Sequence, residues 1–167
     1  MPELSLDALN AAEPELAERE LLACCAARRW ADELIVRRPY HDVETLERVS
    51  DTIFVELTWA DIEQGLSAHP RIGERATGEG RQASWSRAEQ SAAATDQLQD
   101  QLRAGNADYE RRFGHVFLIC ATGLTAEAIL EDLMNRLSND EPTEHEVVRE
   151  ELRKIATLRL RKLVRTA

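Results

Sequence analysis

Apolar residues recur at spacings of three and four along most of this chain, and no other feature constrains its fold as strongly. Between residues 43 and 57 they are Val43, Leu46, Val49, Ile53, Phe54 and Leu57. Side chains at this spacing share one face of an α-helix. Because only 7 of the 167 residues are glycine and 5 are proline, few positions interrupt such helices. We therefore predict an all-α fold, with residues 1–167 forming a single domain of ordinary size.

Capping residues and prolines divide this pattern into roughly eight helices. Pro14 suits a first helical turn, Asp42 suits an N-cap, and Thr58 is followed three residues later by an acid. Gly105 is predicted to end one helix, and Asn106 to cap the next. The predicted helical stretches are residues 4–27 with a break at Pro14, 30–36, 42–57, 58–69, 86–104, 106–113, 125–137 and 143–164.

The charge balance narrows the range of partners. With 21 basic and 31 acidic residues, the formal net charge is −10. Such a chain gains no counterion-release free energy from a phosphate backbone, so we do not expect nucleic acid as a partner. The end of the chain is locally basic, and favourable placement of cations at a helix C-terminus accounts for this. These basic residues are Arg153, Lys154, Arg159, Arg161, Lys162 and Arg165.

Signals for membranes, export and metals are not apparent in the sequence. No segment approaches the ~18–20 continuous apolar residues of a membrane span, and Met1–Leu4 does not begin a signal peptide. We therefore expect a cytoplasmic protein that does not bind membranes. Cys24, Cys25 and Cys120 fit this compartment as reduced, buried thiols. Because the spacings typical of metal ligands do not occur, no metal site is predicted.

Two segments depart from the helical pattern. Residues 71–84 contain three glycines and mixed charge without periodicity, and loops of this length are often functional. The run Val116–Ala121 is apolar throughout, and a buried extended segment or helix turn is predicted for it. Its main-chain N–H and C=O groups need partners, which a small polar ligand could supply. His115 is a weaker candidate for the same site.

A histidine and a glutamate stand out as candidates for acid–base chemistry. His69 is expected at the C-terminal end of its helix, before Pro70. Glu89 follows Ser86 by three residues, and Gln90 adds a second hydrogen-bonding side chain there. Each has a structural alternative, because a histidine often ends a helix and Ser-x-x-Glu is a capping box. The residues alone leave both interpretations open.

Arg159 is the most informative charged residue on physical grounds. At 100° per residue it falls in the middle of the apolar stripe of its helix, between Ile155 and Leu163. A buried guanidinium needs an anion or several carbonyl groups. An internal salt bridge and a clamp for an anionic ligand both satisfy this need. Arg136 lies nearer the edge of its own helix's apolar face, where a solvated or salt-bridged role is favoured.

Several short motifs, in this order, resemble the 2-oxo-4-hydroxy-4-carboxy-5-ureidoimidazoline decarboxylase family of the urate-to-allantoin pathway. The motifs that carry the resemblance are Ala68–Gly73, Ser86–Gln90, Tyr109–Gly114, Phe117–Gly123, Asn135–Asp140 and Ile155–Leu160. The match covers nearly the whole chain. One departure is Pro70-Arg71-Ile72-Gly73, where the resemblance to animal and plant members would give a Pro-Asp-Leu form.

The resemblance implies a helical enzyme that forms (S)-allantoin by decarboxylation without a cofactor. It implies that His69 is the catalytic acid or base, that Glu89 lies beside it, and that Arg159 contacts the substrate. It further implies a small-molecule substrate and a homodimer. The other residues that it places around the substrate are Pro70, Ser86, Gln90, Phe117, Leu118, Ile119, Cys120 and Ala121.

Two alternative functions compete with this one. In a catalytically silent helical interaction module, His69 would end a helix, Glu89 would cap one and Arg159 would form a salt bridge. Another lyase or hydrolase of purine breakdown is the second alternative. The sequence leaves open whether Arg136 or His115 joins the site.

Overall fold

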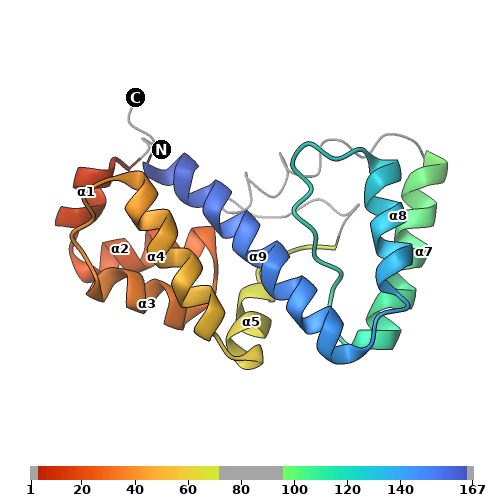
Figure 1. Ribbon diagram of the computed structural model, residues 1–167. Coiled ribbons are helices and arrows are strands. Elements are labelled where there is room, and N and C mark those ends of the chain that lie inside the picture. Colours follow the sequence, from red (N-terminus) through yellow and green to blue (C-terminus); the bar gives the residue numbers. More distant parts are fainter. Residues whose placement is uncertain (1–3, 72–95, 165–167) are drawn as a thin grey trace. The chain divides into compact units, whose positions relative to one another are not determined.

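The computed structural model describes residues 4–71 and 96–164, and this part of the chain contains helices but no strand (Figure 1). The predicted all-α fold is confirmed. The contacts within the chain gather into two compact units. Unit 1 combines the described residues up to Ala68 with those from Leu152 onward, and unit 2 lies within His69–Glu151. The helices are α1 (Leu6–Ala11), α2 (Pro14–Cys24), α3 (Arg28–Val36), α4 (Val43–Glu56), α5 (Trp59–Leu66), α7 (Asp96–Phe113), α8 (Ala126–Arg136) and α9 (Glu141–Val164).

The helices of unit 1 begin where the capping residues predict. Pro14 occupies the first turn of α2, and the Asp42 side chain accepts a hydrogen bond from the Thr45 N–H at the start of α4. At α5, Thr58 and Asp61 form a complete capping box. These contacts satisfy N–H groups that a helix start leaves without partners.

Helix α3 is the centre of packing in unit 1, since it contacts α2, α4 and α5. Its Trp30 side chain is fully buried, lies 6.2 Å from the ring of Phe54, and donates a 2.9 Å hydrogen bond to Ser50. Gly65 of α5 lies so close to α9 that an added Cβ would come within 2.8 Å of the Leu152 side chain. Close helix packing here therefore depends on the missing side chain.

Helix α5 ends earlier than the sequence predicts. Its last residue is Leu66, and the Ser67 N–H closes the final turn onto Glu63 and Gln64. The prediction that His69 ends this helix is therefore wrong. A proline disfavours the helical conformation in the residue before it. Pro70 therefore favours a position of His69 outside the helix.

In unit 2, α7 and α8 lie side by side (Figure 1). The prediction that Gly105 ends a helix and that Asn106 caps the next is wrong, because α7 continues through both to Phe113. A Cβ at Gly105 would lie 2.9 Å from the Leu133 side chain of α8. The glycine thus serves the close approach of two helices rather than a cap.

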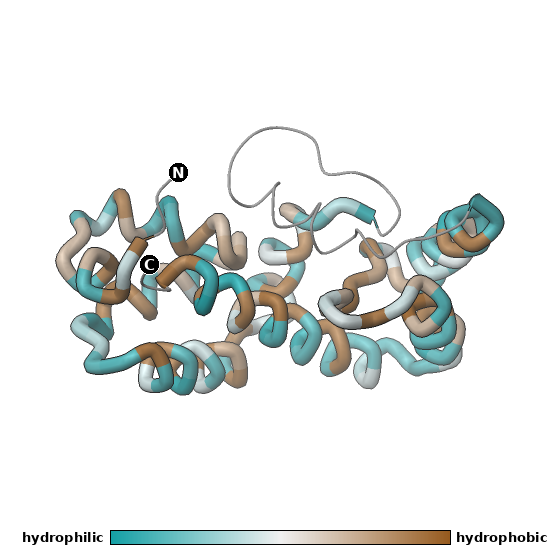
Figure 2. Tube along the Cα trace, turned by 90° about the horizontal axis from the view of Figure 1, so that it is seen from above, coloured by the Kyte–Doolittle hydropathy of each residue, from teal (hydrophilic) through white to brown (hydrophobic). Residues whose placement is uncertain are grey.

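The chain between α7 and α8 is neither helix nor strand, so of the two alternatives predicted for the apolar run, the helix turn is wrong. Gly114 and Gly123 bound it with φ values of 81° and 80°, a conformation that favours glycine. Helix α9 comes after α8, and hydrophobic and hydrophilic positions alternate along its length (Figure 2). Its residues up to Glu151 belong to unit 2 and those from Leu152 to unit 1. Within the described residues, no helix is long and apolar enough to span a membrane.

Candidate active site

His69 opens unit 2 in a short non-helical segment that is held to α7. The His69 and Pro70 side chains are half-buried, and Arg71 is exposed. The Arg71 Nε atom lies 2.6 Å from an oxygen of Glu110 on α7. This ion pair fixes the chain two residues after the candidate acid–base group.

The apolar run predicted to line the site is buried in the same unit. Phe117, Leu118, Ile119 and Ala121 are each at most 5% exposed, and Cys120 is half-buried. The Leu124 N–H donates to the Ala121 carbonyl oxygen at 3.0 Å, which turns the chain toward α8. Cys24 and Cys25 are buried free thiols as predicted, whereas Cys120 is less buried than predicted.

A buried polar network lies against this run. Arg136 of α8 donates to the Glu144 carboxylate through Nε at 2.9 Å and Nη2 at 2.6 Å. The Tyr109 hydroxyl donates to the same carboxylate, and the Asn139 amide does so at 3.0 Å. The guanidinium also lies 4.5 Å from the centre of the Phe117 ring, a favourable cation–π distance.

The charges of this network neutralise one another. Arg136 is 4% exposed and Glu144 is fully buried, so each charge requires the other. Burial lowers the Arg136 pKa, but the hydrogen bonds and charge of Glu144 outweigh this and raise it overall. Burial and the neighbouring Glu144 carboxylate raise the pKa of Tyr109, which stays protonated as a donor. The predicted salt bridge at Arg136 is correct, and the solvated alternative is wrong.

Among the described residues, two buried side chains of α8 and α9 bind main-chain atoms of the apolar run directly. Arg136 Nη1 donates to the Leu118 carbonyl oxygen at 2.9 Å. The Cys120 N–H donates to a Glu151 oxygen at 3.1 Å, and Glu151 is itself 9% exposed. The run is therefore anchored at two nearby residues from two different helices.

Arg159 belongs to unit 1 and is buried, as its place in the apolar stripe predicts. It is 1% exposed, and its Nη1 atom donates to the Cys24 carbonyl oxygen at 3.5 Å. Burial raises the pKa of the neighbouring Cys25 thiol to about 11, although an Ala27 main-chain hydrogen bond and the Arg159 charge oppose the rise. The guanidinium is thus held in buried surroundings, where opposite charges attract each other more strongly than in water.

The described residues bring some of the predicted site residues into one unit. His69, Pro70 and the run Phe117–Ala121 lie in unit 2, and Arg159 lies in unit 1. Ser86, Glu89 and Gln90 lie outside the described residues. His115 is half-buried, with its Nδ1 atom 3.0 Å from the Val116 carbonyl oxygen. Among the described side chains, no group of three His, Cys, Asp or Glu residues could hold a metal ion.

Glu144 and Glu151 are contacts that the sequence interpretation missed. Both could have been found by the argument that singled out Arg159. Counted at 100° per residue from Val148, Glu144 falls near −40° and Glu151 near −60°, on the apolar side of α9. Acids at such positions signal buried partners as clearly as a buried arginine does.

The fold and these motifs correspond to an all-helical class of decarboxylases. The sequence model of the family described as OHCU decarboxylase matches residues 10–161. The chain therefore belongs to the OHCU decarboxylase family.

Individual relatives agree with this assignment. The chain is 32% identical over 155 residues to a uric acid degradation bifunctional protein TTL of Arabidopsis thaliana, covering 89% of this chain and 48% of that protein. It is 34% identical over 131 residues to 2-oxo-4-hydroxy-4-carboxy-5-ureidoimidazoline decarboxylase of Amia calva, covering 76% and 75%. The chain thus spans about half the length of the Arabidopsis relative.

A solved structure has the same fold. The crystal structure of OHCU decarboxylase in the presence of (S)-allantoin superposes with a TM-score of 0.77 at 26% identity, covering 93% of this chain and all of that one. A structure of (S)-allantoin synthase shares the fold, with a TM-score of 0.70.

Proposed function

We propose that this protein decarboxylates 2-oxo-4-hydroxy-4-carboxy-5-ureidoimidazoline to (S)-allantoin and CO₂ in urate degradation. The observation that carries the proposal is the match of residues 10–161 to the OHCU decarboxylase family. The structural neighbour crystallised in the presence of (S)-allantoin supports it. Since the match extends through residues of both units, residues 1–167 are proposed to act as one catalytic domain.

The reaction itself explains the kind of site that is needed. Cleavage of the bond to the carboxylate releases CO₂ and leaves an electron pair on the ring carbon. The adjoining unsaturated ring delocalises this pair, so the substrate supplies its own electron sink and no cofactor is required. The pair moves into the adjoining C=N bond and leaves an enol. A proton is then delivered to the neighbouring ring carbon, which carries the ureido group and becomes the stereocentre of (S)-allantoin, while the enol hydroxyl loses its proton and becomes the ring carbonyl. The protein must orient the ring and deliver the proton to one face.

Three residues are proposed to act at the reacting atoms. His69 donates the proton, since imidazole has an ordinary pKa near neutrality. Glu89 orients the imidazole or binds a hydroxyl or ureido group. Arg159 binds ring oxygens that gain negative charge, because clamping the departing carboxylate would stabilise the ground state instead.

The remaining proposed contacts hold the substrate around these groups. The main chain of Phe117–Ala121 offers hydrogen-bonding groups in buried surroundings, where they stabilise a polar ligand more strongly than in water. Pro70, Ser86 and Gln90 are proposed to complete the pocket.

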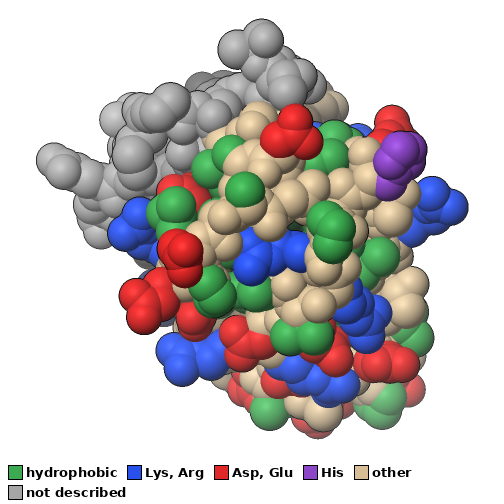
Figure 3. Space-filling view, turned by 90° about the vertical axis from the view of Figure 1, so that its left-hand side faces the viewer, with side chains coloured by type: hydrophobic (Ala, Val, Ile, Leu, Met, Phe, Trp, Pro, Cys, Tyr) green, Lys and Arg blue, Asp and Glu red, His purple; other side chains and the backbone are tan. Residues whose placement is uncertain are grey.

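We also propose that this protein acts on a small molecule and works in the cytoplasm as a homodimer. We propose that it binds neither nucleic acid nor a membrane. The net charge of −10 supports the absence of nucleic acid. On the face seen in Figure 3, acidic and basic side chains are interspersed, which gives a phosphate backbone no continuous basic surface. Light scattering after gel filtration tests the homodimer.

A coupled assay tests the activity. Urate oxidase and 5-hydroxyisourate hydrolase convert urate to fresh substrate, and the protein is then added. Circular dichroism should show optically active (S)-allantoin growing much faster than in the uncatalysed reaction. Racemic product at the uncatalysed rate would refute the proposal.

A further inference from the structure

The apolar run Val116–Ala121 has no secondary structure to fix its main chain. A helix or sheet holds each residue through repeated hydrogen bonds, whereas this run depends on side chains from elsewhere. Two buried side chains among the described residues bind it from separate helices, Arg136 in the last turn of α8 and Glu151 in the middle of α9. Both are buried, so water competes little with them.

These two contacts hold neighbouring main-chain groups of opposite kind. Arg136 holds a carbonyl oxygen at Leu118, and Glu151 holds an N–H at Cys120. Arg136 is in turn held by Glu144, which accepts from Tyr109 as well. The position and direction of the peptide groups between Leu118 and Cys120 are therefore set by charged side chains that themselves have little freedom to move.

We propose that Glu151 and Arg136 are positioning residues, which hold the run Phe117–Ala121 in the geometry that binds the substrate. The inference rests on the proposed function, since it assumes that this main chain contacts the substrate. Neither side chain needs to touch the substrate. Because the run is proposed to hold the substrate rather than to act at the reacting atoms, loosening either anchor should weaken substrate binding.

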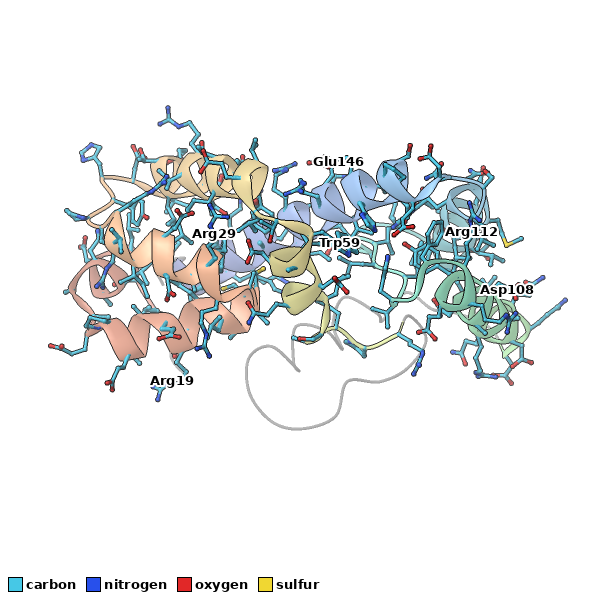
Figure 4. All side chains as sticks on the ribbon, turned by 90° about the horizontal axis from the view of Figure 1, so that it is seen from below. Arg19, Arg29, Trp59, Asp108, Arg112 and Glu146 are labelled. Atoms are coloured by element: carbon cyan, nitrogen blue, oxygen red, sulfur yellow. The ribbon has the colours of Figure 1, made fainter. Side chains whose placement is uncertain are left out.

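The test compares two substitutions of Glu151 with a matched control on the same helix. Glu151→Met removes the acceptor for the Cys120 N–H at similar side-chain length, and Glu151→Gln keeps a carbonyl oxygen there. Glu146→Met makes the same change at a side chain that is 72% exposed and points away from α9 (Figure 4). For each variant, kcat and KM are measured with freshly generated substrate, beside the melting temperature.

A positioning role predicts separate effects on binding and stability. Glu151→Met should raise KM at least about tenfold per folded molecule, with a smaller change in kcat. Glu151→Gln should restore most of the loss, and Glu146→Met should match the wild type. An unchanged KM in Glu151→Met, or a Gln variant as defective as the Met variant, would overturn the proposal.

A second variant covers the case in which Glu151→Met does not fold. Arg136→Lys keeps a cation beside Glu144, but one ammonium group cannot reproduce the planar fork that also reaches Leu118. The same rise in KM is expected, and an unchanged KM would overturn the proposal. The wild-type assay separates the two claims. An inactive wild type refutes the proposed function, whereas an active wild type with normal Glu151→Met and Arg136→Lys refutes only the positioning role.

Discussion

At the scale of single residues, three charged side chains of α9 lie on the side that packs into the protein. Glu144 pairs with Arg136, Glu151 accepts the Cys120 N–H, and Arg159 donates to the Cys24 carbonyl oxygen. Buried charges of this kind cost free energy unless they are paired. Their presence on one helix therefore points to roles that an apolar residue could not fill.

Arg159→Lys tests whether the shape of this cation matters as well as its charge. A lysine keeps the charge but loses the planar fork, and a lost charge-assisted hydrogen bond costs about 1.5–3 kcal/mol. We expect kcat/KM per folded molecule to fall roughly 10- to 100-fold. The coupled allantoin assay and thermal melting measure this on one preparation.

Arg153→Lys is the matched control for this prediction. Arg153 lies on the same helix, but its partner Asp51 is 44% exposed, and partly exposed ion pairs contribute little. We expect wild-type activity in the control. Equal activity in Arg159→Lys and Arg153→Lys would place Arg159 in the scaffold.

The buried thiol beside Arg159 predicts how stability depends on pH. The pKa of Cys25 is about 11 in the folded protein, against 9.0 for an ordinary thiol. Between these values the unfolded chain loses the proton while the folded protein keeps it, so stability falls as the pH rises. Cys25 should contribute a slope of about 1.4 kcal/mol per pH unit. Urea unfolding from pH 8 to 10.5 should show a shallower decline for Cys25→Ala, and parallel curves would contradict this.

At the scale of helices, glycines control how closely two helices can approach each other. Gly65 lets α5 approach α9, and Gly105 lets α7 approach α8. Neither glycine turns the chain, since both lie inside helices. A glycine lowers helix propensity by about 1 kcal/mol relative to alanine. The close packing that each glycine allows offsets this cost.

Gly105→Val should therefore destabilise the protein, although valine has a better helix propensity than glycine. The new side chain would meet Leu133, which is fully buried and cannot move aside freely. Overpacking of this kind costs about 1–3 kcal/mol. Ala104→Val introduces the same residue one position earlier, at an exposed site of α7, and should cost about 0.5 kcal/mol or less. Equal urea midpoints for the two variants would contradict the packing argument.

Most helices can be predicted from local patterns, and the wrong boundary at Gly105 lies where a long-range contact decides. Caps such as Asp42 and Thr58 act within one turn, so the sequence alone locates them. A glycine inside a helix and one at its end look alike in the sequence until the neighbouring helix is known, so the cap predicted at Gly105 is wrong. The sequence predicts an ion pair as one of two roles for Arg136, but its burial and its partner Glu144 depend on α8 and α9 together.

At the scale of the whole molecule, the family assignment and the chemistry support each other. The match covers residues 10–161, which include His69, Arg159 and the run Phe117–Ala121. Their proposed roles stay predictions, as do those of Ser86, Glu89 and Gln90. The order of short motifs can be recognised from the sequence, because such a reaction needs only a few residues and each must be of a particular type.

The proposed chemistry predicts that activity needs no added cofactor. Because the substrate ring accepts the electron pair itself, a metal or organic electron sink has no step to perform. Activity should survive EDTA treatment and exhaustive dialysis, as measured in the coupled assay. A loss that a divalent metal restores would contradict this prediction.

The most direct measurement is the growth of the circular dichroism signal of (S)-allantoin, recorded for the wild type and for His69→Asn in parallel. The wild type should form (S)-allantoin rapidly. His69→Asn should melt at nearly the same temperature and lose at least about 100-fold in rate, the lower range for a general acid or base. Slow racemic product from the wild type, or undiminished activity in His69→Asn, would contradict the account.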